Sequence, residues 1–182
     1  MGKLLIIADE KGKGYATPRG LQLAAQLGLD AEVVAFTYAS FKHLKVSDQE
    51  GARIRQQLVE DRREEVQARI DKHCREKQKV RLKVVWEKDI IAWVNRQCAR
   101  TEYAYVVKTG RRSENLVHTS SDWQLLRECP APVMIVSDKK WHRTQPVLAA
   151  LDLSTNLRAK KQLNHTILAH AKNLAEVLGV DL

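Results

Sequence analysis

Residues 3–8 read KLLIIA, a short run in which every residue after the lysine is apolar. Such an uninterrupted run predicts a strand that is buried on both faces of a sheet. Similar runs recur along the chain, separated by longer amphipathic stretches, at residues 32–37, 80–86, 103–108 and 132–136. Strands that alternate with crossover helices favour a parallel, doubly wound α/β sheet with helices on both faces.

Helix signals fill the gaps between these runs. Pro18 stands near the start of the first helical stretch and Gly28 stands at its end, as the start and stop preferences of helices predict. Another helical stretch covers residues 89–98. Two capping boxes predict the starts of two further helices, Ser47 with Glu50 and Ser121 with Gln124. The sequence therefore predicts one crossover helix between each pair of successive strands.

The strand–helix pattern begins again towards the end of the sequence. Residues 146–153 (PVLAALDL) resemble residues 3–10 (KLLIIADE), since both are apolar runs that lead into an aspartate. Residues 174–181 (LAEVLGVD) match residues 23–30 (LAAQLGLD) in register. Two matches in the same order indicate that a strand–helix unit is repeated.

These matches divide the sequence into two parts. We expect a first domain over residues 1–138, a polar linker over residues 139–145, and an incomplete second repeat over residues 146–182 that holds only its first strand and helix. A lone parallel strand has no pairing partner, and a single helix covers only one face. The second repeat must therefore dock on the first domain or on another chain, or be the beginning of a longer protein.

Net charge bears on the class of partner. The 182 residues include 31 Lys and Arg against 22 Asp and Glu, a net charge of +9, which raises the hypothesis of nucleic-acid binding. Charges of both signs are interleaved, so a solvated surface of mixed charge is the favoured interpretation. The apolar runs are much shorter than the roughly 20 residues of a membrane span, and no secretory signal is visible. We therefore expect a cytoplasmic protein.

The metal-binding and thiol residues show no site pattern. Cys74, Cys98 and Cys129 lie far apart, and their odd number without CxxC spacing argues against a disulfide framework and against a zinc site. We interpret them as reduced, mostly buried thiols. The six histidines do not cluster with carboxylates or cysteines. We therefore expect no metal.

Polar residues follow two of the expected strands, at the edge of a doubly wound sheet where ligands bind. Asp9 follows the first strand, and residues 108–110 (KTG) follow the fourth. Arg111, Arg112 and the backbone N–H groups of the helix that opens at Ser121 would suit an anion. Each residue also has a structural interpretation: Asp9 as a turn residue, Ser121 as a cap, and the arginines as solvated loop charges. Nothing in the sequence nominates a nucleophile.

Residues 119–130 read TSSDWQLLRECP, which is similar to the Thr-Pro-x-Asp-Trp-x-Leu-Leu-Arg-x-Cys-Pro stretch in the first domain of the tandem, E-type universal stress proteins. Asp9 after the first strand and Thr109-Gly110 after the fourth also resemble the pattern of that family. The resemblance covers residues 3–136 as one domain and residues 146–182 as the beginning of a second. We therefore expect a five-stranded sheet of order 3-2-1-4-5, with an extra strand–helix unit at the C-terminus.

The resemblance also implies a nucleotide site, which this sequence carries in an altered form. ATP-binding members of the family have Gly, two residues, Gly, nine residues, Gly, and then Ser or Thr. Here Gly110 is kept, Ser113 and Thr119 replace the other two glycines, and the spacer of residues 114–118 is five residues long. A side chain at a position that needs positive φ costs about 1 kcal/mol, and a shorter loop narrows the phosphate cradle. We therefore expect no cofactor, with ATP at most a weak ligand.

The residues that would line such a site follow from the resemblance. Ser120 takes the place of the hydroxyl that contacts phosphate, and Ala35 takes the place of the backbone groups that meet an adenine. The full implied set is Asp9, Ala35, Thr109, Gly110, Ser113, Thr119, Ser120 and Ser121.

The function that the resemblance implies is that of a cytoplasmic universal stress protein that acts by binding and dimerising, without catalysis. Family members pair through the last strand, here residues 132–136, so we expect a homodimer, and other stress proteins are further candidate partners. Two alternatives stay open. One is an ATP-binding universal stress protein with weak ATPase activity. The other is a basic nucleic-acid-binding protein, whose affinity would fall steeply with salt.

Overall fold

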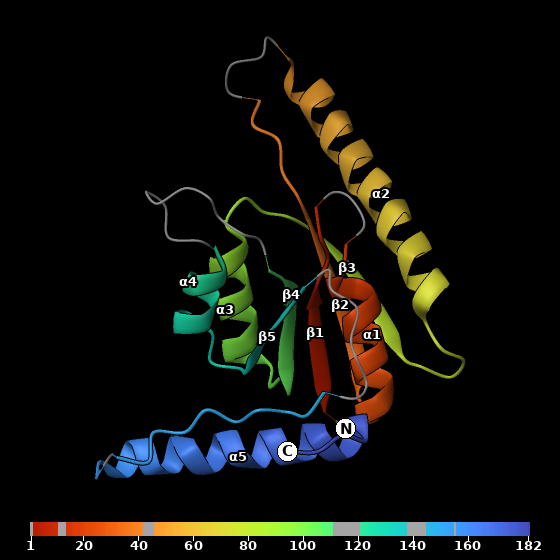
Figure 1. Ribbon diagram of the computed structural model, residues 1–182. Coiled ribbons are helices and arrows are strands. Elements are labelled where there is room, and N and C mark those ends of the chain that lie inside the picture. Colours follow the sequence, from red (N-terminus) through yellow and green to blue (C-terminus); the bar gives the residue numbers. More distant parts are fainter. Residues whose placement is uncertain (1, 11–13, 42–45, 111–120, 138–144, 155) are drawn as a thin grey trace. The chain divides into compact units, whose positions relative to one another are not determined.

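Five parallel strands form a sheet in the computed structural model, which describes residues 2–10, 14–41, 46–110, 121–137, 145–154 and 156–182. The strands follow the order β3-β2-β1-β4-β5, and each pair of neighbours is parallel (Figure 1). Their bounds are β1 Lys3–Ile7, β2 Asp30–Thr37, β3 Val80–Trp86, β4 Tyr105–Thr109 and β5 Val133–Val136. The predicted doubly wound fold and its strand order are therefore confirmed.

The crossover helices also lie where the sequence predicts them. Their bounds are α1 Ala16–Leu27, α2 Asp48–His73, α3 Ile90–Arg100 and α4 Ser121–Glu128. The capping box of α2 is present, because Ser47 Oγ accepts from the Glu50 N–H while the Glu50 carboxylate accepts from the Ser47 N–H. Helix α4 is described from Ser121, which directly follows residues outside the described ones, so the capping box of Ser121 and Gln124 stays a prediction.

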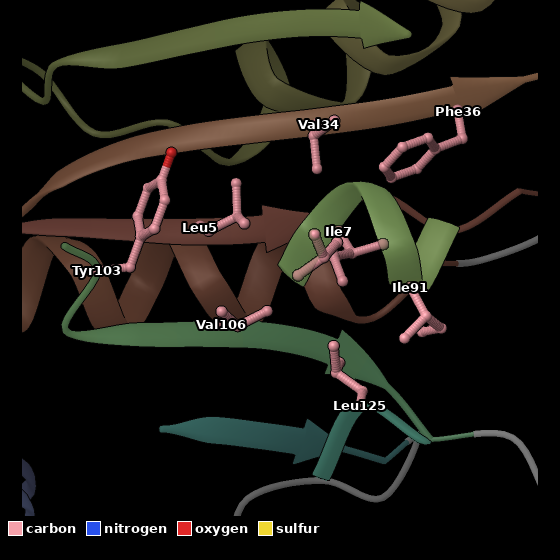
Figure 2. Packing of buried hydrophobic residues seen from close by; sticks show 9 residues of the cluster. Leu5, Ile7, Val34, Phe36, Ile91, Tyr103, Val106 and Leu125 are labelled. Atoms are coloured by element: carbon pink, nitrogen blue, oxygen red, sulfur yellow. The ribbon is translucent and has the colours of Figure 1, made fainter. Parts of the chain in front are cut away.

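One face of the sheet is covered by α3 and α4. Alternate residues of a strand point to the same side of a sheet, and alternate residues of β1 and β2 face these helices. Figure 2 shows the resulting cluster of buried side chains, which comprises Leu5, Ile7, Val34, Phe36, Ile91, Val94, Tyr103, Val106 and Leu125. Trp93 of α3 meets Phe36 edge to face, with ring centroids 5.3 Å apart. This cluster fixes α3 and α4 against the sheet.

The opposite face is covered by α1 and α2 (Figure 1). Gly20 lets α1 approach β1 closely, because a Cβ atom at this position would lie 2.6 Å from Ile6 Cγ1. Val66 and Ile70 are buried on α2, although most of that helix is polar. Strand β1 is the central strand of the order β3-β2-β1-β4-β5. Because helices cover both faces of the sheet, packing from two sides holds the end of β1, just before Asp9.

Residues 139–182 form a compact unit of their own, apart from residues 1–138. Helix α5 Arg158–Leu178 forms as expected in this second unit. The predicted strand over residues 147–151 pairs with no strand in the described residues. Val147 N–H instead donates to the Asp181 carbonyl, 2.8 Å away, just after α5 ends. The expected strand–helix unit is therefore a helix with an unpaired segment, because a strand needs a neighbour to complete its hydrogen bonds.

Candidate functional site

Two of the predicted site residues meet where β1 and β4 end. The Thr109 hydroxyl donates to Asp9 Oδ2 at 3.0 Å. The backbone N–H of Ala16, the first residue of α1, donates to Thr109 Oγ1 at 2.9 Å and to Asp9 Oδ2 at 3.3 Å. The topology explains the meeting, since β1 and β4 are adjacent parallel strands whose carboxyl ends share one edge. Both side chains thus serve the start of α1.

A buried arginine from α2 holds the turn that follows β1. The Arg62 side chain is 7% exposed. Its Nη2 donates to the Asp9 carbonyl at 2.5 Å and its Nη1 donates to the Glu10 carbonyl at 3.2 Å. Glu65, one turn along the helix, pairs with the same Nη1 at 2.6 Å. The Arg62 guanidinium therefore ties the backbone of Asp9 and Glu10 to α2.

Sequence reasoning missed Arg62, although a signal was present. Leu58, Val66 and Ile70 mark a stripe along α2 with a spacing of four residues, and position 62 completes this stripe. A charged residue at an inward-facing position of a helix is rarely buried unless it is paired. The gap in the stripe was therefore a pointer to a buried polar contact.

A second ion pair joins β4 to α4. Lys108 Nζ pairs with Asp122 Oδ1, and the two side chains are only 12% and 14% exposed. The same ammonium group donates to the Thr109 carbonyl at 3.3 Å. Because this charge is already neutralised, Lys108 is a poor candidate for binding a phosphate.

Gly110 follows directly after this lysine and is constrained by β5. Its N–H donates to the Val136 carbonyl at 2.8 Å. A Cβ atom on Gly110 would lie 2.7 Å from Ile135 Cγ2. A larger residue at this position would therefore force the Ile135 side chain of β5 to shift.

A small cavity lies where β1 and β4 end. Three predicted positions, Asp9, Thr109 and Ser121, line a cavity of about 70 Å³ together with neighbouring residues of β1, α3 and β4. Ala35 is fully buried inside β2 and does not line this cavity. Ser113, Thr119 and Ser120 lie outside the described residues. The structure thus brings Asp9, Thr109 and Ser121 together at this cavity, and Ala35 is not among its lining residues.

A larger hollow lies beyond the ends of β2 and β3. Its volume is about 660 Å³, and it is lined by residues that include Tyr38, Phe41, Arg55 and Trp86. The Trp86 ring lies 6.1 Å from the Phe41 ring, and the Arg55 guanidinium carbon lies 5.3 Å from the Trp86 centroid. Trp86 is half-buried and lines this open surface.

The part of the chain that the structure describes contains neither a cluster of metal-binding side chains nor a helix that could span a membrane. No three His, Cys, Asp or Glu side chains there come together in a way that could hold a metal ion. None of the helices there combines the length and the hydrophobicity that crossing a membrane requires.

Curated proteins with related sequences share one name. The chain is 27% identical over 185 residues to the universal stress protein E homolog of Haemophilus influenzae, a match that covers 97% of this chain and 60% of that protein. It is 23% identical over 178 residues to universal stress protein E of Escherichia coli K12, covering 95% of this chain and 56% of that protein. The chain therefore spans somewhat more than half the length of these relatives. No family model matches it.

Solved structures share the fold. A protein of unknown function from Pseudomonas aeruginosa PAO1 superposes with a TM-score of 0.65 at 21% identity, over 99% of this chain and 58% of that one. A member of the universal stress protein family from Burkholderia pseudomallei gives a TM-score of 0.55 at 18% identity, over 74% and 95% of the two chains. A universal stress protein in complex with cAMP gives a TM-score of 0.52 at 10% identity, over 76% and 98%.

Proposed function

We propose that this chain, which belongs with the universal stress proteins by its sequence relatives and its fold, is a non-catalytic binding and dimerisation protein of the cytoplasmic stress response. Its nucleotide site binds ATP weakly or not at all. The observation that carries the proposal is the network at the ends of β1 and β4, where Asp9, Thr109 and the Ala16 N–H bond to one another.

Contacts already made within the site support this proposal, because the groups that could contact a nucleotide are engaged. Asp9 Oδ2 accepts two or more hydrogen bonds, and Lys108 is paired with Asp122. A nucleotide would have to compete with these internal contacts.

Titration calorimetry of the full chain with ATP and Mg²⁺ tests the proposal. Affinity weaker than about 1 mM is expected. A dissociation constant in the low micromolar range would contradict it, and turnover of the bound ATP would favour the alternative of a weak ATPase. Titration with cAMP belongs in the same experiment, because a protein of this fold was solved with that ligand.

A pair of variants locates any binding that is found. Asp9→Ala removes the carboxylate from the network, and Asp71→Ala removes a carboxylate of the same charge from an exposed position on α2. If a nucleotide occupies the site at β1 and β4, Asp9→Ala changes its affinity while Asp71→Ala leaves it unchanged. Equal effects would place the nucleotide elsewhere.

Dimerisation is the second part of the proposal. Strand β5 lies at one edge of the sheet, next to β4 alone. Apolar side chains are exposed on this strand and on the neighbouring α4: Ile135 is 37% exposed, Leu126 48% and Trp123 64%. An edge strand with apolar neighbours favours pairing with a second copy. These features support a homodimer built on β5 and α4.

Light scattering after size-exclusion chromatography tests this arrangement. Ile135→Lys is expected to convert the dimer into a monomer, because it buries a charge at the proposed interface. Ile54→Lys is the matched control, since Ile54 has a similar exposure of 39% but lies on α2. Circular dichroism checks that both variants fold. A wild-type chain that stays monomeric at high concentration would overturn this part of the proposal.

A further inference from the structure

Two of the three cysteines lie side by side although they are distant in the sequence. Cys98 is in α3 and Cys129 directly follows α4. Their sulphur atoms are 3.8 Å apart, across a sequence separation of 31 residues. Both thiols are free, partly buried, and packed against the core cluster beneath α3 and α4. The topology, and no local motif, brings them together.

The two sulphur atoms are already in contact. A sulphur–sulphur bond is about 2.0 Å long, so the atoms, now 3.8 Å apart, must approach by less than 2 Å to bond. The helices that carry them are also tied together nearby, because the Asn95 side chain donates to Glu128 Oε2 at 3.2 Å. The packing of α3 beside α4 therefore holds the two thiols in contact.

The surroundings of the pair favour a thiolate on one side. The contact with Cys98 and the Ala131 N–H lower the pKa of the Cys129 thiol to about 7, against the opposing effect of burial. The contact with Cys129 and burial raise the pKa of Cys98. Since the thiolate is the reactive form, these surroundings favour attack on an oxidant by Cys129, and Cys98, whose sulphur is 3.8 Å away, is positioned to resolve the product.

We propose that Cys98 and Cys129 form a reversible intramolecular disulfide when the protein meets a peroxide. The Cys129 thiolate attacks one peroxide oxygen and the O–O bond breaks. The leaving hydroxide takes up a proton and becomes water, which leaves a sulfenic acid on Cys129. The Cys98 sulphur then attacks the Cys129 sulphur, the S–O bond breaks, and a second water departs. Two thiols and one peroxide thus yield one disulfide and two waters, and a dithiol reductant reverses the bond.

The disulfide would close a loop that contains most of the predicted phosphate-binding positions. It closes a loop from residue 98 to residue 129 that contains β4, Thr109, Gly110 and the predicted phosphate-binding positions up to Ser121. Closing such a loop restricts the unfolded chain more than the folded one, so the oxidised protein is the more stable form. This inference does not depend on whether the chain binds a nucleotide.

Peptide mapping of the full chain tests the inference. The protein is treated with one equivalent of hydrogen peroxide, remaining thiols are alkylated, and the digest is read by mass spectrometry without reduction. The expected product links the peptides of Cys98 and Cys129 and has lost two hydrogen atoms. Dithiothreitol should restore both thiols. The melting temperature of the oxidised protein should rise by about 10 °C.

Three single variants complete the design. Cys74→Ser is the matched control, because the Cys74 thiol donates to the backbone carbonyls of Arg75 and Gln78, and the disulfide should form unchanged. Neither Cys98→Ser nor Cys129→Ser should form an intramolecular disulfide, because each lacks one of the two sulphur atoms.

Several results would overturn the inference. One is a wild-type protein whose thiols all stay reduced under peroxide, a measurement that needs no variant to fold. Another is a disulfide that includes Cys74 or that joins two chains. A third is oxidation of Cys129 to the sulfinic acid while Cys98 remains a free thiol.

Discussion

Residues 3–8 and residues 146–153 are both apolar runs that lead into an aspartate, but only the first becomes a strand. Strand β1 pairs with β2 on one side and with β4 on the other, and Leu5 has an exposure of 0%. In the second unit, Leu148 is 88% exposed and residues 147–151 carry no strand pairing in the described chain. The difference teaches that neighbours complete a strand, and that an apolar run alone does not.

Helix ends behave differently, because their hydrogen bonds are local. Gly28 ends α1 with φ of 65°, and Gly179 ends α5 with φ of 66°. The next N–H also bonds back in the same way in both places, from Leu29 to the Ala24 carbonyl and from Val180 to the Ala175 carbonyl. The matching sequences therefore give matching helix ends in both units, whereas the matching apolar runs give different structures.

The largest expected effect is the difference in unfolding free energy between matching substitutions in the two apolar runs. Leu5→Ala should lower the free energy of unfolding by about 2–5 kcal/mol, because it leaves a cavity in a packed core. Leu148→Ala should change it by less than about 0.5 kcal/mol, as for most exposed positions. Urea unfolding followed by circular dichroism measures both. Similar losses for the two variants would mean that residues 147–151 are packed as firmly as β1.

The next effect concerns the turn after β1. Arg62→Ala removes the donor that serves the Asp9 and Glu10 carbonyls, and the unpaired acceptors should cost about 1–3 kcal/mol of unfolding free energy. Arg63→Ala is the control, because its ion pair with Glu60 is 3.5 Å long and exposed, and such pairs contribute less than about 1 kcal/mol. Equal losses would show that Arg62 contributes only as an exposed charge does.

These contrasts also show what the sequence could and could not reveal. The parallel sheet, the α2 capping box and the polar residues Asp9 and Thr109 at the ends of two strands followed from local patterns and from the rules of parallel sheets, whereas the strand order followed from the resemblance to a known family. The contact between Cys98 and Cys129 did not, because it arises from the packing of α3 beside α4 and leaves no trace in the spacing. The only sequence signal for Arg62 was a gap in the apolar stripe of α2. The lack of a strand partner for residues 147–151 could not be predicted from their own sequence, because pairing depends on whether another strand is available.

A smaller loss of unfolding free energy is expected when the glycine at either helix end is replaced. Gly28→Ala and Gly179→Ala each place a Cβ atom on a residue with positive φ, where nothing else lies within 4 Å. The cost is then purely conformational, about 1 kcal/mol at either site. Urea unfolding of both variants checks it. A loss at Gly28 with none at Gly179 would contradict the idea that both ends are set locally.

The smallest effect concerns Asp152, the counterpart of Asp9 in the second unit. Hydrogen bonds from Ser154 and Lys160 lower its pKa below the ordinary value of 3.8. Its contribution to stability is therefore present above the unfolded-state pKa and is lost as the pH falls through the lower folded-state pKa. Carboxyl-carbon NMR should find this low pKa, and Ser154→Ala should raise it. A normal pKa in the wild-type chain would show that these contacts do not persist in solution.

The most direct test of the proposed function is the amide NMR spectrum of the chain during a titration with ATP and Mg²⁺. The amides of Ala16, Thr109 and Gly110 report on the network at the ends of β1 and β4. We predict that their signals stay in place at low micromolar ATP, because Asp9 and Thr109 remain bonded to the start of α1. Saturable shifts of all three signals in that range would contradict the account.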